Sequence, residues 1–161
     1  MDLDPPASTA SKYTMTRHKN TEIWITYCSK KKIGKNGAWP PEKLYDSYRI
    51  QDFISSCRKE KLEWYILSAK HGLLGKKDKR AKYDFTLRVC SGNIYCLQNG
   101  KILSTKKASE NFNKLVKGIR SKLKKKEVCL YYALEDLPDI GGYIHALVAA
   151  KIDFRLCEKL P

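Results

Sequence analysis

The sequence predicts an α/β fold with three layers, in which a mainly parallel sheet carries helices on both faces and a small hairpin is inserted. The main observation is an alternation along the chain. Short apolar runs without helical spacing are followed by longer segments whose apolar residues recur at helical spacing. Such alternation is typical of parallel strands joined by helical crossovers. The second observation is length, because 161 residues suffice for one domain with its own hydrophobic core.

Four apolar runs predict the strands of this sheet. Each one is rich in β-branched or aromatic residues and breaks into polar residues at its end. Nearly continuous apolar runs are typical of strands that are covered on both sides, so we expect these four to form the centre of the fold. They are residues 22–27, 64–67, 128–132 and 152–156.

Three segments predict helices. The first begins at Pro40-Pro41-Glu42, where a proline and an acid suit the first turn, and its apolar stripe extends to Cys57. The second runs from about Lys107 to Lys125, with one apolar and one basic side. The third is opened by Gly141-Gly142, whose free backbone amides would suit a phosphate or a carbonyl oxygen.

The remaining segments predict the domain organisation. Residues 1–20 are rich in Pro, Ser, Thr and charge and are expected to form a floppy tail, leaving residues 21–161 as a single α/β domain. Within it, Asn99-Gly100 is a strong hairpin signal and predicts an insertion or an added edge at about residues 89–104.

The charge of the chain indicates its partner. There are 32 Lys and Arg against 17 Asp and Glu, a formal net charge of +15, which favours polyanions and nucleic acid above all. A solvated basic surface without a specific partner is the alternative. A membrane is not expected as a partner, because no stretch pairs basic residues with an exposed apolar face.

The cysteines indicate a reducing compartment. The six cysteines are scattered without a Cys-x-x-Cys pair, which argues against structural zinc and against a disulfide scaffold. With no signal peptide or long apolar span in the sequence, we expect buried free thiols in a cytoplasmic protein. No metal and no cofactor is predicted.

The loops after three of the predicted strands carry most of the polar chemistry. Carboxyl ends of parallel strands lie at one edge of a sheet, and ligands bind there, so we expect these loops to surround one basic, partly acidic cleft. Gly72 permits the turn that anchors the second loop. The three groups are Cys28, Ser29 and Lys32; Ser68, Lys70 and His71; and Glu135, Asp136 and Asp139.

Each candidate has a structural alternative. Asp84 is a general base or water-positioning carboxylate, or an acid that caps a turn. His71 protonates or polarises a leaving group, or only binds a loop carbonyl. Cys28 is a nucleophile or a packed strand-end thiol. The rings of Tyr27, Trp39, Tyr45 and Tyr83 provide a base-stacking surface or belong to the core.

Basic residues outside the cleft are expected to contact phosphates, unless they form a solvated face. They belong to two groups, Lys30, Lys31 and Lys32 after the first predicted strand, and Lys114, Lys117, Lys124 and Lys125 on the basic helix.

Four motifs resemble a widespread family of uncharacterised small α/β domains of prokaryotes and phages. They are Cys28-Ser29 followed by Lys, Leu44-Tyr45-x-Ser47, Ser68-Ala69-Lys70-x-Gly72-Leu73-Leu74 and Tyr83-Asp84-x-Thr86-Leu87. More distantly, the second half of this pattern is similar to peroxide-stress DNA-binding proteins and to the uracil-DNA-glycosylase-like domain of archaeal tRNA-modifying enzymes. The Gly-Gln-Asp-Pro-Tyr motif and the cluster-binding cysteines of the main uracil-DNA glycosylases are absent from the sequence.

These features predict a nucleic-acid-directed domain with a pocket for a nucleobase or nucleotide, and glycosidic-bond chemistry if it is an enzyme. In this hypothesis Asp84, His71 and Lys70 are catalytic, and Cys28, Ser29, Tyr45, Ser68, Gly72 and Tyr83 bind the substrate. The alternative is a non-catalytic basic nucleic-acid-binding module. A weaker third hypothesis is a Cys28-dependent enzyme that acts on a small anionic metabolite.

Overall fold

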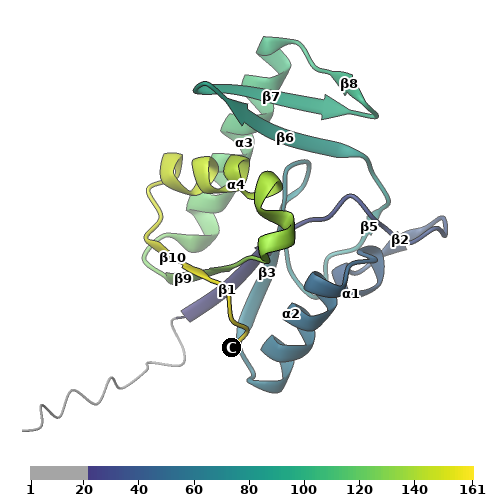
Figure 1. Cartoon of the computed structure of the whole chain (residues 1–161), viewed down its shortest axis with the longest axis vertical. Helices are drawn as coiled ribbons and strands as arrows, with labels where there is room; N and C mark the ends of the chain where they lie inside the picture. Colours follow the sequence, from purple (N-terminus) through teal and green to yellow (C-terminus); the bar gives the residue numbers. More distant parts are fainter. Residues whose placement is uncertain (1–21) are drawn as a thin grey trace, which may run out of the picture.

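A computed structural model describes residues 22–161 (Figure 1), so the predicted tail lies outside the described residues. The main sheet has five strands in the order β10-β9-β1-β3-β4. β1, β3, β9 and β10 are mutually parallel where they pair, and β4 is antiparallel to β3. The mixed α/β class and the mainly parallel sheet are therefore confirmed. The strands are β1 (Glu22–Tyr27), β3 (Glu63–Ser68), β4 (Gly72–Leu74), β9 (Glu127–Tyr131) and β10 (Phe154–Cys157).

Alternate residues of the central strand β1 enter two different hydrophobic clusters. Ile23 and Ile25 pack with residues of α3 (Thr105–Leu123) and α4 (Leu137–Ala149), whereas Trp24 packs with residues of α2 (Tyr48–Lys59). Because successive side chains of a strand point to opposite faces, β1 buries both of its faces. This explains its nearly continuous apolar sequence.

The first predicted helix is two helices in the structure. α1 (Pro41–Leu44) is a single turn with Pro41 at its start, and α2 begins only at Tyr48. The helix breaks because Tyr45 leaves helical geometry and forms a β-bridge with Lys32. Next to this bridge, the Leu44 carbonyl accepts a hydrogen bond from the Ile33 amide. A tertiary contact with the β1 loop thus overrides the helical spacing.

The structure corrects the prediction for Gly141-Gly142. α4 begins at Leu137, so both glycines lie inside the helix, where backbone amides take part in intrahelical hydrogen bonds. They are therefore no anion site. Gly142 instead allows close packing, because a Cβ there would lie 2.8 Å from Leu87 Cγ.

The predicted hairpin is part of a separate antiparallel sheet. Asn99 and Gly100 both have positive φ, as a tight hairpin turn requires, and they join β7 to β8. β6 also pairs with β7 along its whole length, and this pairing was not predicted. The small sheet contacts α3 and α4 and is not an added edge of the main sheet. Its strands are β6 (Phe85–Cys90), β7 (Asn93–Gln98) and β8 (Lys101–Ile102).

A third, two-stranded sheet joins β2 (Ala38–Trp39) to β5 (Arg80–Ala81), and a short 3-10 helix, η1 (Leu134–Asp136), precedes α4. Tyr83 and Asp84 follow β5 closely, so this small sheet fixes where the chain enters that motif. No helix among residues 22–161 combines the length and apolar character that a membrane crossing needs.

Candidate functional site

The loops after β1 and β3 meet at the carboxyl edge of the main sheet. The Cys28 amide donates to the Leu67 carbonyl over 2.9 Å, and β1 and β3 run parallel in register up to Tyr27 and Leu67. The predicted adjacency of these two loops follows directly from that pairing. Asp136, after β9, reaches the same edge through a hydrogen bond from Arg49.

The hydroxyl of Tyr83 is the central polar atom at this edge. It lies 2.6 Å from the Tyr45 hydroxyl and 2.7 Å from Ser68 Oγ. Ser68 Oγ also accepts from the His71 amide over 3.1 Å, so one chain of hydrogen bonds ties three segments together. Burial raises the pKa of both Tyr83 and Tyr45, so their hydroxyls stay protonated.

Two of the predicted substrate-binding residues are inaccessible. Tyr45 is 1% exposed and Ser68 is 0% exposed, so neither can contact a ligand in this conformation. Tyr27 is buried as well, which removes it from the predicted base-stacking surface. Tyr45 and Ser68 instead position Tyr83 through its hydroxyl. Tyr83 is only half-buried, so it approaches the surface where Tyr45 and Ser68 do not.

The ring of Tyr83 lies between a lysine and a histidine. Lys32 Nζ is 4.0 Å from the ring centroid, and the His71 ring packs edge-on at 4.8 Å. Burial lowers the pKa of His71 to about 4, with Arg80 and Lys70 adding to the effect. His71 is therefore a neutral imidazole at neutral pH.

A small hollow lies on the Lys32 side of Tyr83. Its volume of about 30 Å³ holds roughly one water molecule and is too small for a planar base. Cys28 and Asp84 share this hollow as predicted, but Ser68 does not line it. The water-sized hollow is lined by Cys28, Ser29, Lys30, Lys32, Asp84, Phe85, Thr86, Asp139 and Tyr143.

The groups around this hollow are held by neighbouring elements. Cys28 Sγ lies 3.0 Å from the hydroxyl of Tyr143 on α4, and Lys32 Nζ donates to the Ser29 carbonyl over 2.9 Å. Burial lowers the pKa of Lys32, although Cys28 and Asp84 act in the opposite direction. Asp84 itself is exposed at the mouth.

A much larger groove lies on the His71 side, between the loop before β4 and the helix α3. We call it the basic groove. Its volume is about 620 Å³, and the residues that line it include no carboxylate. Gly72, at its rim, has a φ of +75° and makes the turn that was expected of it. The lining residues are Ala69, Lys70, His71, Gly72, Leu73, Arg80, Asn111, Lys114, Leu115, Lys117, Gly118, Ser121 and Lys122.

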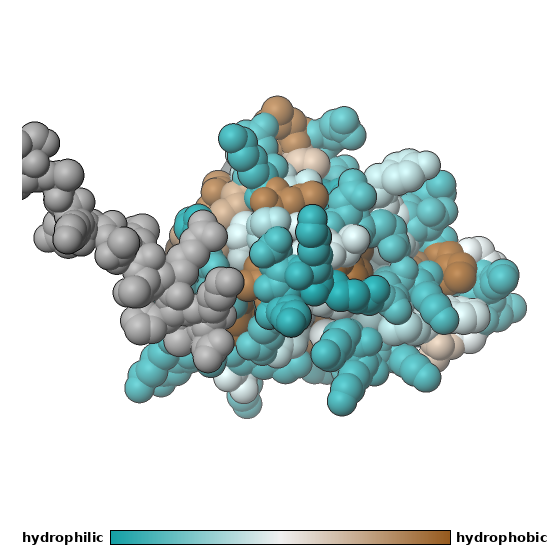
Figure 2. Space-filling view, turned by 90° about the horizontal axis from the view of Figure 1, so that it is seen from below, coloured by the Kyte–Doolittle hydropathy of each residue, from teal (hydrophilic) through white to brown (hydrophobic). Residues whose placement is uncertain are grey.

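The other predicted phosphate contacts do not converge on the basic groove. Lys31 pairs with Asp46 at 3.2 Å, and Lys30 lies at the small hollow. Lys124 follows the end of α3, and Lys125 lines a different depression beside β10. These side chains are exposed, and hydrophilic residues also cover most of the face seen in Figure 2.

Arg49 is a site residue that the sequence prediction missed. Its side chain is buried and donates to Asp136 Oδ2 at 2.7 Å, to Thr26 Oγ1 at 2.6 Å and to the Tyr27 carbonyl at 2.8 Å. It therefore fixes the end of β1 against η1. Its position in the helix could have indicated that Arg49 is buried, because it precedes Phe53 by four residues and so lies on the apolar side of the helix.

The described residues offer no obvious place for a metal. No group of three or more His, Cys, Asp or Glu with suitable geometry occurs among residues 22–161. For binding or chemistry, the hollow provides the carboxylates of Asp84 and Asp139, the Cys28 thiol and lysine amines, and the groove provides cations and the His71 imidazole.

Comparison with known proteins gives a family match. A family model described as "Family of unknown function (DUF6884)" matches residues 23–109, a segment that contains all four motifs of the predicted pattern. No curated protein and no solved structure matches the chain.

Proposed function

The chain belongs to the family of unknown function DUF6884, and from its own residues we propose that it binds nucleic acid through the basic groove. The observation that carries the proposal is the composition of that groove. Lys70, Arg80, Lys114, Lys117 and Lys122 line one concavity without any carboxylate. Such a site favours a chain of phosphates over a zwitterionic or apolar ligand.

The spacing of the cations along α3 supports a phosphate chain as the ligand. Lys114 and Lys122 lie on one helix about 12 Å apart, at a rise of about 1.5 Å per residue. Lys70 and Arg80 face them across the groove. The neutral ring of His71 beside these cations offers a flat surface for a base.

A charge-reversal experiment tests this proposal. We expect Lys114→Glu/Lys117→Glu to weaken binding of a fluorescent oligonucleotide more than tenfold, and to reduce the slope of log affinity against log salt by about 2. Lys106→Glu/Lys107→Glu is the matched control, because these residues are exposed on the same helix but lie outside the groove. The readout is fluorescence anisotropy, with single-stranded and duplex DNA and RNA.

Equal losses in the two double variants would mean that only the overall charge attracts the oligonucleotide. That result would exclude the basic groove as the binding site.

Glycosidic-bond chemistry is a second candidate, supported by the water-sized hollow beside Asp84. In this hypothesis Asp84 orients the water or stabilises positive charge developing on the sugar, and Tyr83 stacks on the base. Lys70 or the neutral His71 would steady the departing base. The hollow would have to widen to admit a base, by movement of Tyr83 or of the loop after β1.

Base release tests this second candidate. The protein is incubated with damaged and modified oligonucleotides and with free nucleosides, and released base is measured by chromatography. We expect Asp84→Asn to abolish release while leaving oligonucleotide binding in the basic groove unchanged. If the wild type releases no base from any of these substrates, the protein is a binding module.

Three further proposals concern the layers of the fold, the compartment and the distant relatives of the protein. The two clusters on either side of β1 support a three-layer arrangement, with α2 opposite α3 and α4. The buried free thiols of Cys57, Cys96, Cys129 and Cys157 support a reducing, cytoplasmic compartment. The distant similarity to DNA-binding and glycosylase-like domains, which rests on the sequence pattern around Gly72 and Tyr83-Asp84, is the third of these proposals.

A further inference from the structure

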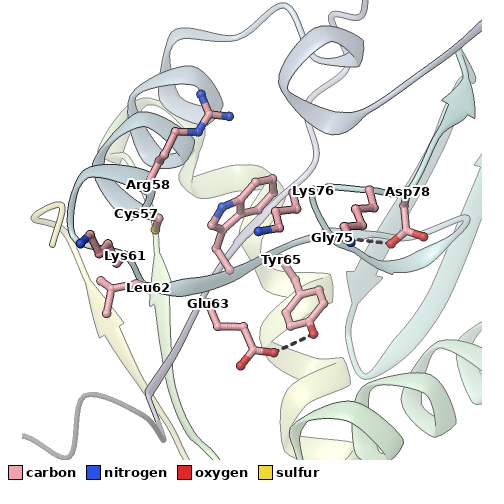
Figure 3. A pocket seen from close by; sticks show the side chains of 11 residues that line it. Cys57, Arg58, Lys61, Leu62, Glu63, Tyr65, Gly75, Lys76 and Asp78 are labelled. Carbon is pink, nitrogen blue, oxygen red and sulfur yellow. Dashed lines mark hydrogen bonds between the residues drawn. The ribbon is translucent and has the colours of Figure 1, made fainter.

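A second large pocket lies at the edge of the main sheet and shares no residue with the basic groove. Its volume is about 630 Å³. Its walls are the end of α2, the first half of β3 and the turn after β4, as Figure 3 shows. We call it the edge pocket; it is lined by residues 57–58, 61–65 and 75–78.

One wall of the edge pocket is a strand with a single neighbour. β1 pairs with β3 from Glu63 onward, but β4 pairs only with Ile66, Leu67 and Ser68. Within residues 22–161, therefore, no strand covers the outer side of residues 63–65. An uncovered strand edge presents backbone N–H and C=O groups at the spacing that another extended chain needs.

The turn after β4 leaves this edge open. The Gly75 amide donates to Asp78 Oδ2 over 2.8 Å, and the Asp78 amide donates to the Gly75 carbonyl over 3.1 Å. This turn leads the chain away from β3 directly after Leu74, so β4 stops after three residues. The opening is thus built by specific hydrogen bonds.

The aromatic residues place the pocket at the sheet edge and not on one face. Trp64 packs in the cluster with α2, whereas Tyr65 packs against the cluster with α3 and α4. Successive strand residues that point to opposite faces can both line one pocket only where the sheet ends.

The charge of the edge pocket is positive. Lys61, Lys76 and Lys77 are exposed and have no ion-pair partner within the described part of the chain. Both carboxylates already have partners: Glu63 accepts from the Tyr65 hydroxyl at 2.8 Å, and Asp78 accepts from the Gly75 amide. Figure 3 shows both bonds, with Lys76 reaching from the turn toward β3.

We propose that the edge pocket binds a short acidic peptide segment as an additional strand beside residues 63–65. The backbone edge selects a polypeptide, because a sugar–phosphate chain has no amide groups to pair with it. Carboxylates of the peptide pair with Lys61, Lys76 and Lys77.

The probe is an array of fluorescent eight-residue peptides that alternate Glu or Asp with Val, Ile or Tyr and have blocked termini. We expect members of the array to bind the full chain, and Lys76→Glu/Lys77→Glu to weaken their binding at least tenfold. Lys76→Gln/Lys77→Gln, which only removes charge, is expected to give a smaller loss. Lys106→Glu/Lys107→Glu is the matched control and is expected to leave binding nearly unchanged.

Two further measurements test strand pairing. Methylation of alternate backbone nitrogens on the pairing side of the best peptide is expected to abolish its binding, although its side chains are unchanged. Hydrogen exchange at the amide of Trp64, which faces away from β1, is expected to slow when the unmodified peptide is bound.

The proposal is overturned if no peptide in the array binds, in which case Lys76 and Lys77 only protect a free edge from self-association. It is also overturned if the methylated peptide binds equally well. A third contrary outcome is slowed exchange at the Trp64 amide by an oligonucleotide but not by any peptide. Binding in the basic groove is unaffected by these outcomes.

Discussion

Tyr83 shows how a single residue organises the candidate site. Its hydroxyl joins Tyr45 and Ser68, and its ring separates the water-sized hollow from the basic groove. The predicted importance of the Tyr83-Asp84 pair is thus compatible with the geometry, although Tyr83 is held by two buried hydroxyls that were expected to bind substrate.

Removal of the Tyr83 hydroxyl tests this organisation. We expect Tyr83→Phe to lower the free energy of unfolding by about 1–3 kcal/mol, because Tyr45 and Ser68 both lose a hydrogen-bond partner in a buried place. The measurement is urea unfolding followed by circular dichroism. Tyr48→Phe is the control, since Tyr48 is 91% exposed, and its free energy of unfolding should match the wild type.

His71 predicts a dependence of stability on pH. Its pKa is about 4 in the folded protein and near its ordinary value of 6.5 in the unfolded chain. Between these values the unfolded chain binds more protons, so the free energy of unfolding falls as the pH decreases from 6.5 toward 4. His71→Gln is expected to flatten this fall, measured by urea unfolding at a series of pH values.

His145→Gln is the control for that series, because His145 packs on Phe112, away from the basic groove. It should keep the fall that the wild type shows. A His71 imidazole that titrates near 6.5 by NMR would contradict the assigned environment. Nucleic acid bound in the basic groove should raise the pKa of His71, since phosphates offset the nearby cations.

At the scale of elements, the contact between α4 and β6 places the small sheet against the main fold. It depends on Gly142, whose position allows Leu87 to approach the helix backbone. This packing role of Gly142 was not predictable from the sequence alone, because α4 and β6 are far apart along the chain. The Gly-Gly signal by itself favoured a helix start.

The two glycines make a matched pair of variants. A Cβ at Gly142 would meet Leu87 Cγ at 2.8 Å and the Leu87 carbonyl at 3.2 Å, so we expect Gly142→Ala to destabilise the protein by about 1–3 kcal/mol. A Cβ at Gly141 would have nothing within 4 Å, so Gly141→Ala should stabilise the helix by about 0.5–1 kcal/mol. Thermal and urea unfolding measure both; stabilisation by both variants would rule out the close contact.

At the scale of the whole molecule, the net charge of +15 opposes the compact state through self-repulsion. We therefore expect the free energy of unfolding to rise when KCl is increased from about 20 to about 200 mM, because salt screens exposed charges over that range. Lys106→Glu/Lys107→Glu lowers the net charge and should reduce the rise. A fall in stability with KCl would show that attractive ion pairs, such as Lys31–Asp46, outweigh the repulsion.

The sequence by itself determined what depends on local pattern. Apolar runs marked four strands of the main sheet, the helical spacing of Phe112, Leu115 and Ile119 marked α3, and Asn99-Gly100 marked the hairpin turn. The common edge of the loops after β1 and β3 also followed, because parallel strands place their carboxyl ends together.

Only the tertiary structure decided which side chains meet and how much space they leave. Tyr45, Ser68 and Tyr83 come together from segments that are distant in sequence. The predicted cleft is divided into the water-sized hollow and the basic groove. Residues 63–65 have no neighbouring strand on their outer side within the described part of the chain. Local spacing encodes which face of an element is apolar. The volume between elements depends on how their side chains pack against each other, and no single segment contains that information.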